Sequence, residues 1–167
     1  MSTLHIAPAT RADVPAILEM IRGLADFERL EHLCIANEGD IERALFGEQA
    51  LVEVVLAWED DQTAGFALFF HNFSTFLGRR GLYLEDLFVR PAFRRRGYGR
   101  ALLVHLARLA VERGCGRFEW TVLDWNAPAI GFYQQLGAQV LPEWRITRVT
   151  GTALALLAAQ PLLPSKR

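Results

Sequence analysis

The stretch that decides the fold of this chain reads Val89-Arg90-Pro91-Ala92-Phe93-Arg94-Arg95-Arg96-Gly97-Tyr98-Gly99-Arg100. A strand-like run rich in Leu, Tyr, Phe and Val precedes it (81–89), and an amphipathic helix follows it (99–113). Glycines let successive backbone N–H groups converge on an anion, and the helix N-terminus adds partial positive charge. Five arginines fall within residues 90–100 with no acid among them, which favours a pyrophosphate as the ligand.

Two alternatives to a pyrophosphate site remain open for this stretch. The pattern GxGxxG and the pattern GxxxxGK are both absent, which excludes the dinucleotide fingerprint and the P-loop. A glycine turn with a solvated arginine cluster would fit the same residues, and so would a nucleic-acid patch. The net charge of −1, from 18 basic and 19 acidic residues, argues against nucleic acid, because nucleic-acid-binding domains are usually basic overall.

The size and composition predict one globular domain over residues 1–167, with 51% hydrophobic and 22% charged residues. The longest apolar stretch (153–159) is far shorter than the ~20 residues that span a bilayer, and the N-terminus has no basic apolar leader. Cys34 and Cys115 make neither a disulfide framework nor a metal-ligand spacing. We therefore expect a cytoplasmic protein with no metal and no membrane contact.

Hydrophobic periodicity and turn residues predict a mixed α/β sheet with crossover helices. Ile17, Leu18, Ile21 and Leu24 recur at helical spacing, and Gly114 stands where a left-handed helix cap belongs. We expect strands at 4–7, 52–58, 63–71, 81–89, 118–123 and 144–149, and further helices at 39–46, 99–113 and 126–137.

Two motifs in this order resemble those of the GNAT N-acetyltransferases. Arg94-x-x-Gly97-x-Gly99 after Leu84-Glu85-Asp86-Leu87-Phe88-Val89 is similar to the family's acetyl-CoA-binding motif, and Asn126-x-Pro128-Ala129-Ile130-x-Phe132-Tyr133 is similar to its second signature. Within the family the chain most resembles the diamine (spermidine/spermine-type) and thialysine acetyltransferases. The resemblance implies a mixed, mostly antiparallel sheet of about six to seven strands flanked by helices, splayed at the acetyl-CoA site.

Acetyl transfer to an amine needs a base, because an alkyl ammonium with a pKa of about 10.4 is almost wholly protonated at neutral pH. The resemblance assigns that role to Glu85, which acts directly or through a water. It assigns the general acid to Tyr133, whose phenol can protonate the departing thiolate. The alternatives without a catalytic role are that Glu85 and Asp86 form a solvated acidic pair and that Tyr133 is an aromatic residue of the core.

The resemblance also implies a set of acetyl-CoA contacts. The backbone N–H of Val89 or a neighbour would meet the acetyl carbonyl, residues 95–100 would give amides to the pyrophosphate, and Arg94 and Arg95 would clamp it. Asn126 and Ala129 would flank the pantetheine, although a helix N-cap role alone would explain Asn126. The complete cofactor set is Leu87, Phe88, Val89, Arg94, Arg95, Arg96, Gly97, Tyr98, Gly99, Arg100, Asn126 and Ala129.

The acceptor is expected to be a small cationic amine. The resemblance places its contacts at Phe27, Glu28, Glu85, Asp86, Glu119 and Trp120. His32 departs from the pattern, because the polyamine enzymes tend to have another acid there, and this leaves room for a shorter diamine or a lysine-like amine. A protein N-terminus or lysine as acceptor, and a non-catalytic CoA-binding regulator, are the alternatives. The family also implies a homodimer. Residues 144–149 and 153–163 could supply its surface, or they could close the core of the monomer itself.

Overall fold

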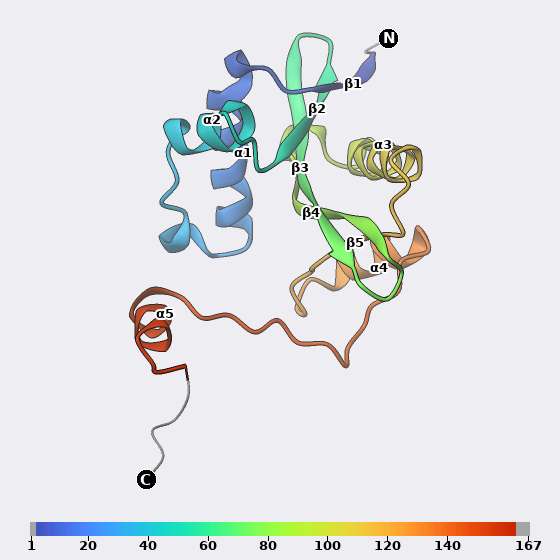
Figure 1. Ribbon diagram of the computed structural model, residues 1–167. Coiled ribbons are helices and arrows are strands. Elements are labelled where there is room, and N and C mark those ends of the chain that lie inside the picture. Colours follow the sequence, from blue (N-terminus) through green and yellow to red (C-terminus); the bar gives the residue numbers. More distant parts are fainter. Residues whose placement is uncertain (1–2, 163–167) are drawn as a thin grey trace. The chain divides into compact units, whose positions relative to one another are not determined.

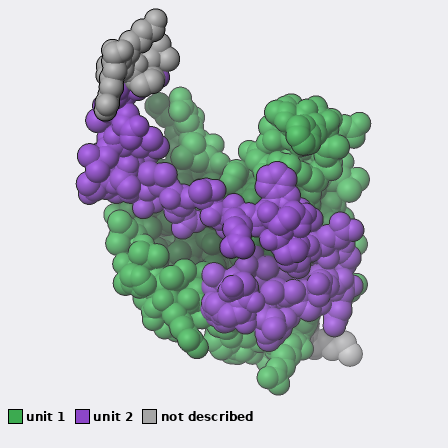
Figure 2. All heavy atoms as spheres, turned by 90° about the horizontal axis from the view of Figure 1, so that it is seen from below, with its two compact units in different colours: residues 1–121 green, residues 122–167 purple. Residues whose placement is uncertain are grey.

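The computed structural model describes residues 3–162, which form parts of two compact units, residues 1–121 and 122–167 (Figures 1 and 2). Each unit is described by itself. The first contains β1 (Leu4–Pro8), α1 (Val14–Phe27), α2 (Glu38–Phe46), β2 (Glu53–Glu59), β3 (Gln62–Ser74), β4 (Arg79–Val89), α3 (Tyr98–Glu112) and β5 (Arg117–Trp120). Short 3-10 turns lie at Arg11–Asp13, Glu31–Leu33 and Pro91–Phe93. The second unit contains α4 (Ala127–Gln135) and α5 (Gly151–Ala158).

The five strands form one mixed sheet in the order β1-β2-β3-β4-β5. Neighbouring strands are antiparallel except β4 and β5, which are parallel and are joined through α3. A parallel pair needs such a crossover, and the stretch from residue 90 to residue 116 provides it. The predicted α/β class and the strands at 4–7, 52–58, 63–71 and 81–89 are confirmed, each within a few residues of its observed bounds.

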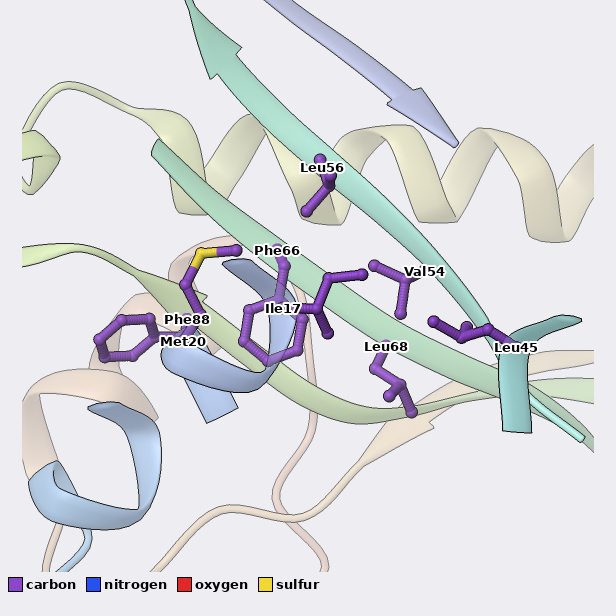
Figure 3. Close-up of a cluster of buried hydrophobic side chains, with 8 residues drawn as sticks. All are labelled: Ile17, Met20, Leu45, Val54, Leu56, Phe66, Leu68 and Phe88. Carbon is purple, nitrogen blue, oxygen red and sulfur yellow. The ribbon is translucent and has the colours of Figure 1, made fainter. Parts of the chain in front are cut away.

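One face of the sheet packs on α1 and α2. Ile17 and Met20 on α1 and Leu45 on α2 contact alternate residues of the strands, among them Phe66 and Phe88 (Figure 3). Because successive strand side chains point to opposite faces, the residues between them face the other layer. That layer is α3, which buries Leu102, Leu103 and Leu106 as its apolar spacing predicts (Figure 1).

Two expectations for the sheet are wrong: the strand at 144–149 and the total of six to seven strands. Residues 144–149 form no strand, and α5 follows them; the described part of the chain therefore has five strands, not six to seven. Trp144 and Ile146 alternate with polar residues as in a strand, but a strand exists only where its backbone finds a ladder partner. The predicted strand at 118–123 is also shorter, because β5 ends at Trp120.

The sheet opens between β4 and β5. Their pairing runs from Gly81 opposite Arg117 to Leu84 opposite Trp120, and β4 then continues to Val89 without a partner on that side. This is the predicted splay. Within residues 3–162, no helix combines the length and the apolar character needed to cross a membrane.

Candidate functional site

A β-bulge in β4 sets the faces of its acidic residues. Leu68 of β3 lies opposite Asp86, but the next residue, Phe69, lies opposite Leu84, so Glu85 is the extra residue. The bulge reverses the alternation: Leu84 shares a face with Phe69, and Asp86 shares the face of Leu68, where α1 packs. Glu85 itself is exposed. The bulge therefore lies at the predicted base.

Three carboxyl groups interact at this bulge. Asp86 is half-buried. Its carboxyl group interacts electrostatically with the negative charges of Glu85, its neighbour in the chain, and of Glu28, which follows the last residue of α1. Burial, followed by these two charges, raises the pKa of Asp86 from 3.8 to about 6. Burial also raises the pKa of Glu28. Such a cluster holds excess negative charge, which a cation relieves.

Backbone groups of β4 line the opened edge next to these acids. The N–H of Arg90 donates to the carbonyl of Ala64 on β3 (2.9 Å), and strand N–H groups alternate in direction, so the N–H of Val89 points away from β3. The N–H of Leu87 points the same way by the same alternation. These donors face the side where β5 no longer pairs, which is the geometry expected of an oxyanion contact.

The loop after β4 leaves the start of α3 without a side-chain cap. Gly97 is the N-cap, its φ is +84°, and no side chain bonds to the first turn. Arg95 also has a positive φ (+62°), so two of the three residues from 95 to 97 adopt the left-handed conformation. A Cβ on Gly99 would meet only Val89 within 4 Å, at 3.8 Å. The uncapped N–H groups and the open space around them fit a pyrophosphate.

The arginines of residues 90–100 have different partners. Arg90 forms an ion pair with Glu19 (2.6 Å), and Arg96 forms one with Glu59 (2.8 Å), two acids that lie far away in the sequence. A hydrogen bond with the same Glu59 raises the pKa of the Tyr98 hydroxyl. Arg95 and Arg100 are exposed. The local charge is therefore smaller than the +5 that the sequence suggests.

Arg94 lies between the strand edge and the end of α1. Its Nε donates to the carbonyl of Val89 (2.9 Å), and its guanidinium carbon lies 5.4 Å from the ring centroids of both Phe27 and Phe88. Phe27 is the last residue of α1 and is 43% exposed. A predicted cofactor residue and a predicted acceptor residue are thus in direct contact.

Two other predicted acceptor residues lie on β5, where it still pairs with β4. Glu119 accepts a hydrogen bond from the side chain of Asn72 (2.6 Å) and forms an ion pair with Arg117 (3.0 Å). Trp120 packs its ring on Phe118, with centroids 4.9 Å apart. Glu119 therefore holds β5 to β3 across the sheet in this structure.

The remaining predicted residues belong to the second unit. Asn126 caps α4, because its side-chain oxygen accepts the N–H of Ala129 (3.3 Å). Tyr133 lies half-buried on α4, with its ring 5.4 Å from that of Phe132. The helix that the Asn126-x-Pro128 pattern predicts is confirmed; the catalytic role of Tyr133 stays a prediction.

Other features of the first unit do not join this site. A mostly apolar cavity of about 230 Å³ lies between α2, β2 and α3, and Arg113 at its edge binds Glu53 through two hydrogen bonds (2.6 and 2.8 Å). None of the predicted site residues lines it. Within residues 3–162, no group of three or more His, Cys, Asp or Glu residues could hold a metal.

An opened parallel strand pair, an uncapped helix N-terminus at the end of the first of these strands, and acids on that strand define an α/β domain with an anion site beside a cation site. Residues 19–138 match the model of the acetyltransferase (GNAT) family. The chain belongs to this family.

Its relatives include acetyltransferases of amines. The chain is 38% identical to L-ornithine N5-acetyltransferase NATA1 of Arabidopsis thaliana, covering 90% of this chain and 86% of that one. It is 35% identical to thialysine N-epsilon-acetyltransferase of Mus musculus, covering 96% and 100%. Among solved structures, an integron cassette protein from the mobile metagenome of V. cholerae superposes with a TM-score of 0.79 at 28% identity, covering 94% and 98%.

Proposed function

We propose that this protein transfers the acetyl group of acetyl-CoA to a primary amine of a small diamine, polyamine or lysine-like acceptor. The observation that carries the proposal is the pairing of two opposite electrostatic sites along β4. The carboxyl groups of Glu28, Glu85 and Asp86 attract a cation, and the uncapped start of α3 attracts an anion. A transferase that joins a cationic amine to an anionic carrier needs both.

The catalytic steps follow from the chemistry of the residues. Glu85, exposed at the bulge, takes a proton from the acceptor ammonium, directly or through a water. The N–H of Val89 stabilises the oxyanion that forms when the amine attacks the thioester. Tyr133 gives a proton to the departing thiolate. Residues 95–100 bind the pyrophosphate, and Asn126 with Ala129 flanks the pantetheine arm.

Phe27, Glu28 and Asp86 bind the rest of the acceptor. Relatives named for ornithine and thialysine, whose names specify side-chain nitrogens, support an acceptor with an aliphatic chain and a terminal amine. Glu119 and Trp120 complete the acceptor set in this proposal. The Oε1 of Glu119 accepts from Asn72 and pairs with Arg117, and we assign its Oε2 to the acceptor.

The wider setting is also a proposal. We place the protein in the cytoplasm, in line with its free thiols Cys34 and Cys115, and treat residues 1–167 as one catalytic domain. We expect a homodimer. Trp144 and Ile146, 75% and 67% exposed, are large apolar residues of the kind that an interface covers; Leu163, in the predicted dimer segment, lies outside the described residues. Sedimentation at several concentrations tests the dimer.

The direct test is turnover with a panel of amines. Purified protein is given acetyl-CoA with diamines, polyamines, ornithine or thialysine, and the released thiol is measured. We expect turnover on at least one of them, and Tyr133→Phe should lower kcat about 100-fold or more while the Kd for CoA changes less than twofold. CoA binding without turnover on any amine contradicts the proposal, and an unchanged kcat in Tyr133→Phe removes Tyr133 as the acid.

A further inference from the structure

Arg94 makes three contacts that join separate parts of the first unit. Its Nε donates to the carbonyl of Val89, its guanidinium lies over the ring of Phe88 in the core, and it lies over the ring of Phe27 at the end of α1. Apart from this side chain, these partners belong to two elements, α1 and β4. A single arginine therefore links the end of the helix to the end of the strand.

The position of the Val89 carbonyl gives this link a functional meaning. This carbonyl points to the opened edge of β4. If the pairing with β5 continued to this residue, β5 would supply the hydrogen-bond donor for the carbonyl. Arg94 supplies that donor instead. The same edge carries the Val89 N–H that would meet the acetyl carbonyl, so the guanidinium holds the backbone next to the reacting group.

The side chain is suited to this work and less suited to the pyrophosphate. A planar guanidinium can lie on two aromatic rings while one N–H donates in its plane, which an ammonium cannot do in the same way. The exposed Arg95 and Arg100 remain for the anion, together with the uncapped start of α3. The contacts of Arg94 in this structure are with the end of β4 and with Phe27, a predicted acceptor residue.

We propose that Arg94 is a positioning residue for the acceptor: it fixes Phe27 against the opened edge of β4 and does not clamp the cofactor. The proposal rests on the proposed acetyl transfer to an amine. It predicts that changes at Arg94 act on acceptor binding through Phe27, while the affinity for CoA stays the same.

The test compares Arg94→Lys with the matched control Arg108→Lys, because both keep the charge of an exposed arginine and Arg108, on α3, lies outside the proposed site. CoA affinity is measured by calorimetry, and kcat and KM are measured with the amine that the wild type acetylates. In Arg94→Lys we expect the acceptor KM to rise about tenfold and the Kd for CoA to stay within twofold. In Arg108→Lys both the acceptor KM and the Kd for CoA should change less than twofold. A CoA Kd that rises tenfold in Arg94→Lys overturns the proposal.

A double-mutant cycle separates positioning from a general disturbance. If Arg94 acts through Phe27, then Arg94→Lys should raise the acceptor KM less than twofold further in a Phe27→Ala background. A full tenfold rise in that background contradicts the proposal. If the wild type turns over none of the amines, the result counts against acetyl transfer itself. If the wild type is active and the acceptor KM is unchanged in Arg94→Lys, the result contradicts only the proposed role of Arg94.

Discussion

Replacing Asp86 by asparagine is expected to stabilise this protein at neutral pH and to leave its stability unchanged in acid. Asparagine keeps the shape of a protonated aspartate but cannot ionise. In the native protein, burial and the negative charges of Glu85 and Glu28 make the ionised form of Asp86 unfavourable. They raise the pKa of Asp86 from 3.8 to about 6. The substitution removes that cost.

The size and sign of the effect follow from proton linkage. The folded state binds the Asp86 proton more tightly than the unfolded state does, so its contribution to stability is lost as pH rises from 3.8 to about 6. A pKa shift of about two units corresponds to about 3 kcal/mol at most. Above the folded pKa the whole loss persists, and below the unfolded value it vanishes.

The assay is urea unfolding of wild type and Asp86→Asn at pH 3, 5 and 7.5. We expect the variant to gain up to about 3 kcal/mol at pH 7.5, less at pH 5, and almost nothing at pH 3. Asp61→Asn makes the same chemical change at an exposed residue in the turn between β2 and β3, and its effect at each pH is the reference against which Asp86→Asn is compared. The same Asp86→Asn protein should bind the amine acceptor more weakly, because the substitution removes one carboxylate of the proposed acceptor site.

Two outcomes would refute this reasoning. A variant that is less stable than wild type at pH 7.5 would mean that the Asp86 carboxylate is satisfied in the fold. A gain of the same size at pH 3 and pH 7.5 would mean that asparagine improves packing and that ionisation plays no part.

Two glycine substitutions test the backbone around the site. Gly97→Ala should lower the free energy of unfolding by about 1 kcal/mol and weaken CoA binding. The cause is backbone strain at a φ of +84°, since a Cβ there would meet nothing within 4 Å. Unchanged values in urea unfolding and calorimetry would contradict this. Gly65→Ala should cost about 3 kcal/mol, because a Cβ there would lie 2.5 Å from the Phe88 carbonyl oxygen in the adjacent strand; a loss below about 1 kcal/mol in the same unfolding assay would show that β4 can move aside.

Local sequence patterns predicted most of the elements because each carries its own signal. The apolar spacing of residues 17–24 predicts α1, and Asn126 with Pro128 predicts the start of α4, which the Asn126 side chain does cap. Residues 144–149 show where such signals stop. Their apolar spacing describes a surface that could pair, but which strand offers an edge is a property of the whole sheet.

The site could be predicted only in part for a similar reason. The glycine loop is local, and its motif predicted an anion-binding turn at the start of a helix, where the structure has Gly97 with a φ of +84° as the N-cap of α3. The partners of its arginines were not, because Glu19 and Glu59 lie 71 and 37 residues from Arg90 and Arg96. The contact of Arg94 with Phe27 likewise depends on where α1 ends against β4.

The bulge at Glu85 also bears on how this site can change over evolutionary time. Since Glu85 is surplus to the ladder, its deletion would bring Leu84 and Asp86 into regular alternation opposite Phe69 and Leu68, where they already lie. The pairing of β3 with β4 would then be continuous, and Phe88 would keep its place in the core. A lineage could therefore lose the proposed base by one codon deletion and retain a folded protein, so a one-residue gap at this place in a relative marks the loss of chemistry and not of architecture.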